Sequence, residues 1–337
     1  MCLPMDQHRA VGLGLIAFLY ACGSRTGLLY NFDGSSGSAS ATDDSSGDDT
    51  IQLADGGSNQ GCSDGGGSTV PIYLIDDTNT LLAYAPASGT ISPIGLVNCP
   101  TDAGPYPIAF AIDQQQRVGY LIYSESDGDH SYHFDTNSLT CVSVGTDGIV
   151  PMDSVAPSTL TFVATKGSGQ ETLYDIENPK ITPPAYLISY VATIDPTTFV
   201  DTLRFRTLGT DVTTEVPPCD VRPESCSTSS GLFGDGAGHL YGTWSVGGEL
   251  GPHVFNIDTA TGAWSPLWQT LSVDSHNPTA TATIWGGDVY LFTGAMERDI
   301  TRSAVLRYCP RGPSYSLVAT WDHSVILAAT PTSAPTD

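Results

Sequence analysis

The chain carries very little positive charge. Its 337 residues include 36 acidic and only 12 basic residues, which gives a formal net charge of −24, and its lysines are limited to Lys166 and Lys180. Binding to nucleic acid depends on neutralising phosphates with Lys and Arg, so this composition argues against a nucleic-acid partner. It also argues against electrostatic attachment to a membrane. The acidic excess is typical of a surface that keeps an exported protein soluble.

Common catalytic and metal-binding patterns are missing too. The chain has no H-E-x-x-H and no C-x-x-C, and its one G-x-S-x-G, at residues 61–65, lies in a Gly/Ser-rich segment without the strand and helix that expose a nucleophile. His130 and His133, beside Asp127 and Asp129, are the best metal-ligand candidates. Residues three apart on a strand point to opposite faces, however. We therefore predict no catalytic, cofactor-binding or metal-binding residues and no cofactor.

Helical periodicity is absent from about residue 70 onward. Short runs of Val, Ile, Leu, Tyr, Phe and Thr are separated by Gly, Asp, Asn and Pro, which predicts an all-β domain over residues 70–337. The pattern is clearest in residues 253–294. There, one hairpin turns at residues 258–262 and a second turns at residues 286–288.

This pair of hairpins recurs along the chain. An apolar residue precedes a turn at five places, 50 to 63 residues apart, and a second hairpin lies between several of them. Two hairpins make one four-stranded sheet, and such a sheet must bury both of its faces against its neighbours. The recurrence therefore predicts a β-propeller of about five to six four-stranded blades. A pair of β-sandwiches is the alternative. The five apolar anchors are Tyr84, Phe134, Ile194, Ile257 and Tyr308, and Asp135, Asp195 and Asp258 follow three of them, placed to hydrogen-bond the turn backbone.

Residues 1–21 form a predicted signal peptide. The apolar run from Val11 to Tyr20 is shorter than the roughly 20 residues that a membrane-spanning helix needs. Residues 19–22, Leu-Tyr-Ala-Cys, resemble a bacterial lipobox, which implies a lipidated Cys22. Tyr20 departs from the small residue usual in that slot, so cleavage nearby by ordinary signal peptidase is the alternative. Three acyl chains would hold the protein firmly on a membrane surface. By the same resemblance, Gly23 after the cysteine favours the outer membrane.

Residues 22–69 have a different composition from the rest of the chain. They are rich in Gly, Ser and Asp and contain hardly any apolar residues. Such a segment cannot bury enough surface to offset the entropy lost on ordering. We therefore expect a disordered acidic tether between the signal peptide and the propeller domain.

Several segments resemble a family of uncharacterised propeller-like lipoproteins of myxobacteria. The similarity covers roughly residues 15–325 and includes ACGSRTGLL, LVNCP, SLTCVSVG, ETLY, GDGAGHLYG and WGGDVYLFT. Residues 258–264, with Gly286-Gly287 and the following strand, also resemble one kelch repeat. The resemblance implies a location and a fold but no activity. The chain departs from the family at its end, which lacks a cysteine.

The cysteines fit an oxidising compartment. With Cys2 in the removed segment and Cys22 lipidated, six cysteines are left, an even number. The family resemblance implies a pair between Cys99 and Cys141. The short spacing of Cys219 and Cys226 favours a small closed loop, and Cys62 with Cys309 follows by elimination.

These observations leave three classes of function. The first is a non-catalytic propeller on the cell envelope, lipid-anchored to the outer membrane, that binds protein or glycan through loops on one face. The second is a propeller enzyme that acts on extracellular glycan, and the third is a purely structural envelope component. We favour the first class, and hence a protein that is not an enzyme, because no catalytic residue set can be named from the sequence.

Overall fold

The computed structural model describes residues 67–336 apart from several internal segments, and the structural statements below concern these residues. The chain divides into two units, residues 1–51 and 52–337, and every described residue belongs to the second. The internal segments outside the description are 101–106, 126–127, 145–148, 151–156, 167, 178–189, 207–230, 245–252, 270–279, 294–302 and 312–313.

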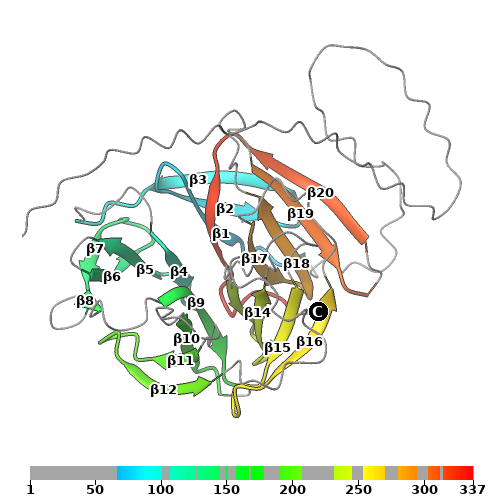
Figure 1. The fold of residues 1–337 in the computed structure, drawn as a ribbon. Helices are drawn as coiled ribbons and strands as arrows, with labels where there is room; N and C mark the ends of the chain where they lie inside the picture. The colour runs from blue at the N-terminus through cyan, green and yellow to red at the C-terminus, as the bar shows by residue number, and fades with distance from the viewer. Residues whose placement is uncertain are drawn as a thin grey trace, which may run out of the picture. The chain divides into compact units, whose positions relative to one another are not determined.

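The described residues form five antiparallel sheets, which we call blades I to V (Figure 1). Each has four strands, which follow one another in sequence in blades II to V, and blade II has an additional short strand, β8, beside β6. From the innermost strand outward, blade I consists of β21 (Val325–Ala329), β1 (Ile72–Asp76), β2 (Thr80–Ala85) and β3 (Thr90–Leu96), and blade II consists of β4 (Ala109–Ile112), β5 (Val118–Glu125), β6 (Gly128–Asp135) and β7 (Cys141–Ser143), with β8 (Ile149–Val150). Blade III consists of β9 (Pro157–Ala164), β10 (Glu171–Glu177), β11 (Tyr190–Ile194) and β12 (Asp201–Arg206), and blade IV consists of β13 (Gly231–Gly234), β14 (Leu240–Trp244), β15 (His253–Ile257) and β16 (Trp264–Gln269). Blade V consists of β17 (Ala280–Trp285), β18 (Asp288–Thr293), β19 (Ser303–Cys309) and β20 (Ser314–Trp321).

The innermost strands form a closed ring. β21 lies beside β4, β4 beside β9, β9 beside β13, β13 beside β17, and β17 beside β21 again (Figure 1). Five sheets arranged in this way around one axis make a five-bladed β-propeller. The predicted fold class is therefore confirmed, with five blades.

Blade I takes its strands from both ends of the chain. β21 pairs antiparallel with β1, whereas each of the other blades is one continuous stretch of chain. This pairing closes the ring without a covalent connection between the two strands. It also explains why the sequence shows five outer hairpins, at the five predicted anchors, but fewer inner ones. In blade I, the inner hairpin is replaced by a pairing between the chain's two ends.

Each blade buries both of its faces against its neighbours. In β1, alternate residues serve the two sides: Leu74 packs in a cluster with Trp285 of blade V, and Ile75 packs in a cluster with Phe110 of blade II. Five clusters of buried apolar residues, one for each interface between blades, follow one another around the ring. Burying one large apolar side chain stabilises the fold by about 1.5–3 kcal/mol, so these interfaces provide its main apolar stabilisation.

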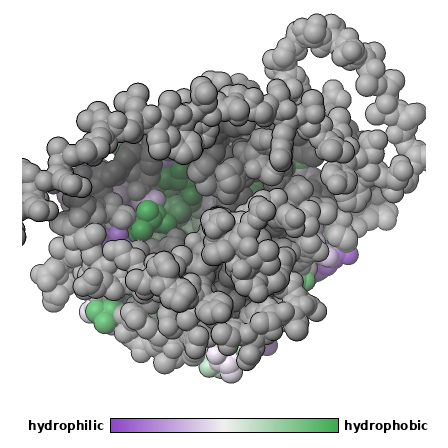
Figure 2. All heavy atoms as spheres, in the orientation of Figure 1, coloured by the Kyte–Doolittle hydropathy of each residue, from purple (hydrophilic) through white to green (hydrophobic). Residues whose placement is uncertain are grey.

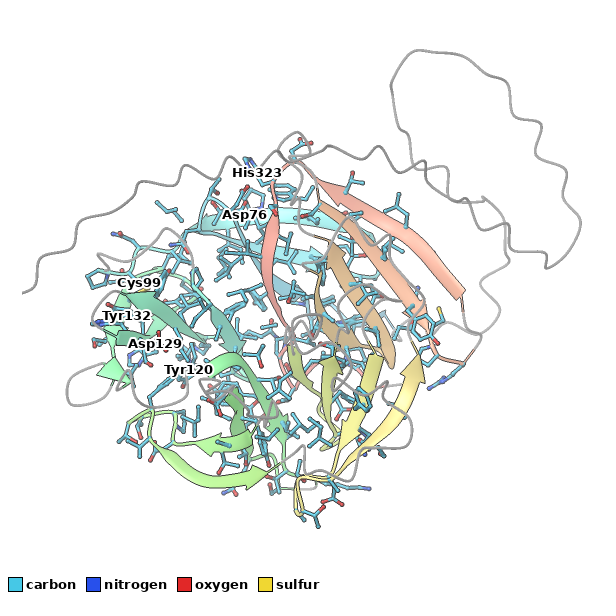
Figure 3. All side chains as sticks on the ribbon, viewed as in Figure 1. Asp76, Cys99, Tyr120, Asp129, Tyr132 and His323 are labelled. Atoms are coloured by element: carbon cyan, nitrogen blue, oxygen red, sulfur yellow. A yellow bond between two sulfur atoms is a disulfide. The ribbon has the colours of Figure 1, made fainter. Side chains whose placement is uncertain are left out.

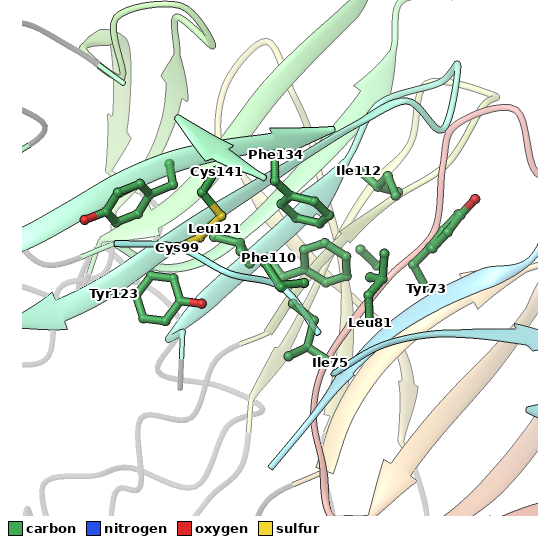
Figure 4. Packing of buried hydrophobic residues seen from close by; sticks show 13 residues of the cluster. Tyr73, Ile75, Leu81, Cys99, Phe110, Ile112, Leu121, Tyr123, Phe134 and Cys141 are labelled. Carbon is green, nitrogen blue, oxygen red and sulfur yellow. A yellow bond between two sulfur atoms is a disulfide. The ribbon is translucent and has the colours of Figure 1, made fainter. Parts of the chain in front are cut away.

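A disulfide joins the interface between blades I and II. Cys99 and Cys141 are bonded, with their Cα atoms 4.8 Å apart, as the family resemblance implied. Both cysteines belong to the cluster that contains Tyr73 and Phe110 (Figure 4). The bond fastens the connection that follows β3 to the start of β7.

Replacing both cysteines, Cys99→Ala with Cys141→Ala, is expected to destabilise the propeller by about 2–4 kcal/mol. The bond closes a loop of 42 residues and so restricts the unfolded chain. Urea unfolding of the parent and the double variant, each followed by tryptophan fluorescence, measures the difference. Equal midpoints would show that the cluster around the bond is sufficient without it.

Connections between strands alternate between two faces of the propeller because successive strands run in opposite directions. We call one face the turn face. In blades II to V it contains the connection between the first and second strands and the connection between the third and fourth strands, and in blade I it contains the β2–β3 connection. The strand ends joined by the second connections of these blades, by the β1–β2 connection and by the links between blades are at the opposite face, which we call the loop face. Turn-face connections span no more than six residues, whereas 24 residues separate β12 from β13 on the loop face.

Candidate functional site: the loop face of the propeller

The last residues of the chain cross the turn face. After β21, the hydroxyls of Thr330 and Thr283 lie 2.7 Å apart in a buried contact with blade V. The amide of Gly286, in the β17–β18 turn, donates a hydrogen bond to the carbonyl of Pro335 at 2.8 Å. We call residues 330–336 the C-terminal segment.

The same segment is bound to blades III and IV. Thr332 donates a hydrogen bond from its hydroxyl to Glu171 of blade III, whose other carboxylate oxygen accepts one from the amide of Gln114 in blade II. In blade IV, Gly236 approaches Thr332 so closely that a Cβ at this position would lie 2.1 Å from the Thr332 carbonyl oxygen. Inner turns of neighbouring blades are thus tied together through the C-terminal segment.

Glu171 has a perturbed carboxyl group. Burial raises its pKa above the ordinary value and the nearby charge of Asp113 raises it further, whereas hydrogen bonds from Thr332 and the amide of Gln114 lower it. Perturbed carboxyl groups often mark active sites, but structural networks perturb them as well. Both oxygens of Glu171 hold chain segments together, so we assign it a structural role.

The predicted turn aspartates behave as expected. One carboxylate oxygen of Asp135 accepts hydrogen bonds from the amides of Asn137 and Ser138, at 2.9 and 2.8 Å, and Asp195 and Asp258 accept equivalent bonds in blades III and IV. These hydrogen bonds, together with a bond from the Thr197 hydroxyl that has the largest effect at Asp195, favour the ionised form and lower the pKa of all three carboxyl groups. Each turn therefore depends on a charged aspartate.

The turns are expected to make stability sensitive to acid. A carboxyl group whose pKa is lower in the folded state than in the unfolded state stabilises the fold when it is ionised. This stability is fully present above the unfolded pKa, about 3.9, and it is lost as the pH falls through the pKa of the folded state. The triple variant Asp135→Asn, Asp195→Asn and Asp258→Asn keeps the acceptor oxygens but does not titrate. Between pH 5 and pH 2.5, its thermal midpoint should fall less steeply than that of the parent. Parallel curves would contradict the assignment.

The loop face differs from the turn face in connection length and charge. The β10–β11 connection has 12 residues and the β12–β13 connection has 24. Counted between strand ends, loop-face connections contain 14 acidic and 4 basic residues, whereas turn-face connections contain 4 and 3. Long connections displayed on a rigid scaffold are where binding residues concentrate in folded proteins. The loop face is therefore the better candidate for a functional surface.

Three side chains with metal-binding chemistry meet on the loop face. Asp76 ends β1 and Asp77 follows it in the β1–β2 turn, and His323 lies in the short link between β20 and β21. Asp76 and His323 are labelled in Figure 3. Each offers one ligand atom, and these atoms lie within 4.8 Å of one another. The Nδ1 atom of His323 is 3.5 Å from Oδ1 of Asp77.

The backbone holds these residues together. The amide of Asp77 donates a hydrogen bond of 2.8 Å to the carbonyl of Ser324, and Asp76 is paired with Val325 in the β1–β21 ladder. Neither sequence spacing nor any motif points to this cluster, because its members come from opposite ends of the chain. Sequence reasoning missed it for that reason.

The structure also places the two histidines that were considered as metal-ligand candidates. His130 and His133 lie on the single strand β6, which pairs with β5 along its whole length. No turn separates them, so the two side chains leave opposite faces of the sheet. Asp129, on the same strand, is buried (Figure 3), and Asp127 lies outside the described residues.

Other predicted residues lie outside the description. They are the signal peptide, the lipidation residue Cys22, the tether, Cys62, Cys219 and Cys226. Cys309, the predicted partner of Cys62, is buried at the end of β19 and is disulfide-bonded. In the part of the chain that is described, no helix is long and apolar enough to cross a membrane.

Most of the exposed large apolar side chains lie along the outermost strands, and one, Val200, lies in the β11–β12 connection. Ile94 and Leu96 are on β3, Val142 is on β7, and Leu267 and Leu317 are on β16 and β20. They are thus distributed among blades around the rim. In the view of Figure 2, a small group of hydrophobic residues is visible on the face that the picture shows.

Known proteins resemble this chain in fold alone. No protein-family model matches the chain, and no curated protein matches it either. Among solved structures, TolB from Acinetobacter baumannii is 11% identical with a TM-score of 0.39, and the match covers 74% of this chain and 52% of that one. An exo-beta-1,3-galactanase from Phanerochaete chrysosporium is 8% identical with a TM-score of 0.41, and the match covers 63% of this chain and 50% of that one. The chain therefore spans about half the length of each.

Proposed function

We propose that this protein is a non-catalytic interaction module whose propeller binds a protein or glycan through its loop face. The observation that carries this proposal is the difference between the two faces. One has short turns and is crossed by the C-terminal segment, and the other has the longer connections, which together contain 14 acidic and 4 basic residues. The closed ring of blades is a rigid support for such connections.

Location forms the second part of the proposal. The lipobox-like residues 19–22 support a lipid on Cys22, the Gly/Ser/Asp-rich residues 22–69 support a tether, and Gly23 supports the outer membrane as destination. In this arrangement, the lipid attaches the protein and the tether lets the propeller reach its partner. A Cys22→Ser variant should no longer be found in the membrane fraction. The mass of its N-terminal peptide should differ from that of the lipidated, processed parent. A variant that stayed membrane-bound and was processed like the parent would contradict this part.

The partner-binding part is tested with two variants of equal charge. In the first, four acidic residues of the β12–β13 connection are neutralised: Asp211→Asn, Glu215→Gln, Asp220→Asn and Glu224→Gln. In the second, four tether residues are neutralised: Asp43→Asn, Asp44→Asn, Asp48→Asn and Asp49→Asn. Each protein is used to recover envelope components in mild detergent, with salt varied from 50 to 500 mM.

We expect the parent and the tether variant to retain the same partner, and the loop-face variant to retain much less of it. Because exposed charges are screened by salt, retention by the parent should also fall as the salt concentration rises. Equal retention by all three proteins, or equal loss in both variants, would contradict binding through the loop face.

A further inference from the structure

We propose that Asp76, Asp77 and His323 form a binding site for a divalent transition metal of the zinc class on the loop face. An imidazole nitrogen and two carboxylate oxygens are a ligand set that zinc accepts, whereas calcium and magnesium prefer oxygen ligands alone. The three ligand atoms are already gathered within 4.8 Å. This inference stands independently of the partner proposed above.

The first support is an oxygen atom without a hydrogen-bond partner. Oδ1 of Asp77 is inaccessible to solvent and accepts no hydrogen bond, although the side chain as a whole is 37% exposed. Leaving a carboxylate oxygen buried in this state is costly. A cation bound at this atom would remove the cost.

The second support is the separation of Asp77 and His323. Their nearest atoms are 3.5 Å apart, and no hydrogen bond joins them. Two ligands at about 2.1 Å from a tetrahedral zinc ion lie about 3.4 Å from each other. The observed spacing therefore fits two ligands of one metal ion.

The third support is the way Asp76 is held. One of its oxygens accepts hydrogen bonds from the amide and hydroxyl of Thr78, at 2.9 and 2.6 Å, and from the amide of Thr80 at 3.0 Å. The other accepts a longer one, of 3.3 Å, from the indole of Trp321. Such contacts orient a carboxylate in the manner of the outer hydrogen bonds around known metal ligands. The more weakly bonded oxygen is the one we assign to the metal.

A second His–Asp pair in the same chain shows a different arrangement and serves as the control. Nδ1 of His239 is 2.8 Å from Oδ2 of Asp235, and Oδ1 of Asp235 accepts bonds from the amides of Ala237 and His239. The hydroxyl of Tyr241 reaches the same Oδ2. Both oxygens are engaged, and no third ligand joins them among the residues that the structure describes, so we expect no metal there.

The test is titration of zinc chloride into the chelator-treated, untagged full-length protein, followed by calorimetry and by the thermal midpoint. The parent should bind one equivalent of zinc and gain thermal stability. Asp77→Asn and His323→Ala should each weaken that binding at least about tenfold and abolish the stabilisation. His239→Ala should behave like the parent, and calcium chloride should not compete.

Two results would overturn the proposal. One is a parent protein that binds no zinc, and the other is zinc binding that is equal in the parent and in all three variants. Because Asp77 and His323 are partly exposed, both variants should fold, and their midpoints without metal verify this. Asp76 is left unchanged since its hydrogen bonds also form the turn.

Discussion

Deleting residues 325–337 is expected to prevent the propeller from folding. The deletion removes β21, which is the innermost strand of blade I and lies beside the inner strands of blades II and V. It also leaves the edge of β1 unpaired and removes the hydrogen bond from Thr332 to Glu171. We expect a loss of at least about 5 kcal/mol, comparable with the whole stability of a typical domain. Circular dichroism during heating should show no cooperative transition.

A shorter deletion separates closure of the ring from the C-terminal segment. Removing only residues 330–337 keeps β21 in place and removes the contacts with Thr283, Gly286 and Glu171. This variant should fold, with a lowered thermal midpoint. If the longer deletion also melted cooperatively within a few degrees of the parent, closure through β21 would not be essential.

Removing the carboxylate of Asp288 is expected to produce the second large effect. This residue is 2% exposed at the start of β18, and its Oδ2 accepts two hydrogen bonds from the guanidinium of Arg307 on β19, at 2.8 and 2.5 Å. Arg307 is itself largely buried. Asp288→Ala leaves the buried cation without its carboxylate, which costs about 3–5 kcal/mol. Urea unfolding measures the loss.

The double variant Asp288→Leu with Arg307→Met provides the control for this prediction. Replacing both members of a buried ion pair with apolar residues is often nearly neutral, because the desolvation cost disappears together with the attraction. The double variant should therefore be more stable than Asp288→Ala alone. If the single variant lost less than about 1 kcal/mol, the pair would contribute no more than an exposed one.

Local patterns were sufficient to predict the blades. Each of the five predicted anchors precedes the turn between the third and fourth strands of a blade, and all five are buried. Turn residues such as Asp135 make the predicted backbone hydrogen bonds. Hairpins involve residues close together in the chain, so alternation and turn chemistry specify them before any tertiary contact forms.

The disulfide, unlike the blades, could not be predicted from local patterns. Neither composition nor spacing selected Cys99 and Cys141 from the fifteen possible pairings, and the family resemblance implied the pair that the structure confirms. The two cysteines meet because a parallel bridge between Asn98 and Thr140 brings their segments together. Such a contact between two blades has no local signal.

The sequence by itself determined the all-β character, the repeated pairs of hairpins and the positions of the stabilised turns, because these depend on residues only a few positions apart. Only the tertiary structure decided that five blades close through β21, that the C-terminal segment crosses the turn face, and that Asp76 and Asp77 meet His323. These features join the two ends of the chain or neighbouring blades. Contacts of such long range depend on how the sheets pack around the ring, which no window of sequence contains.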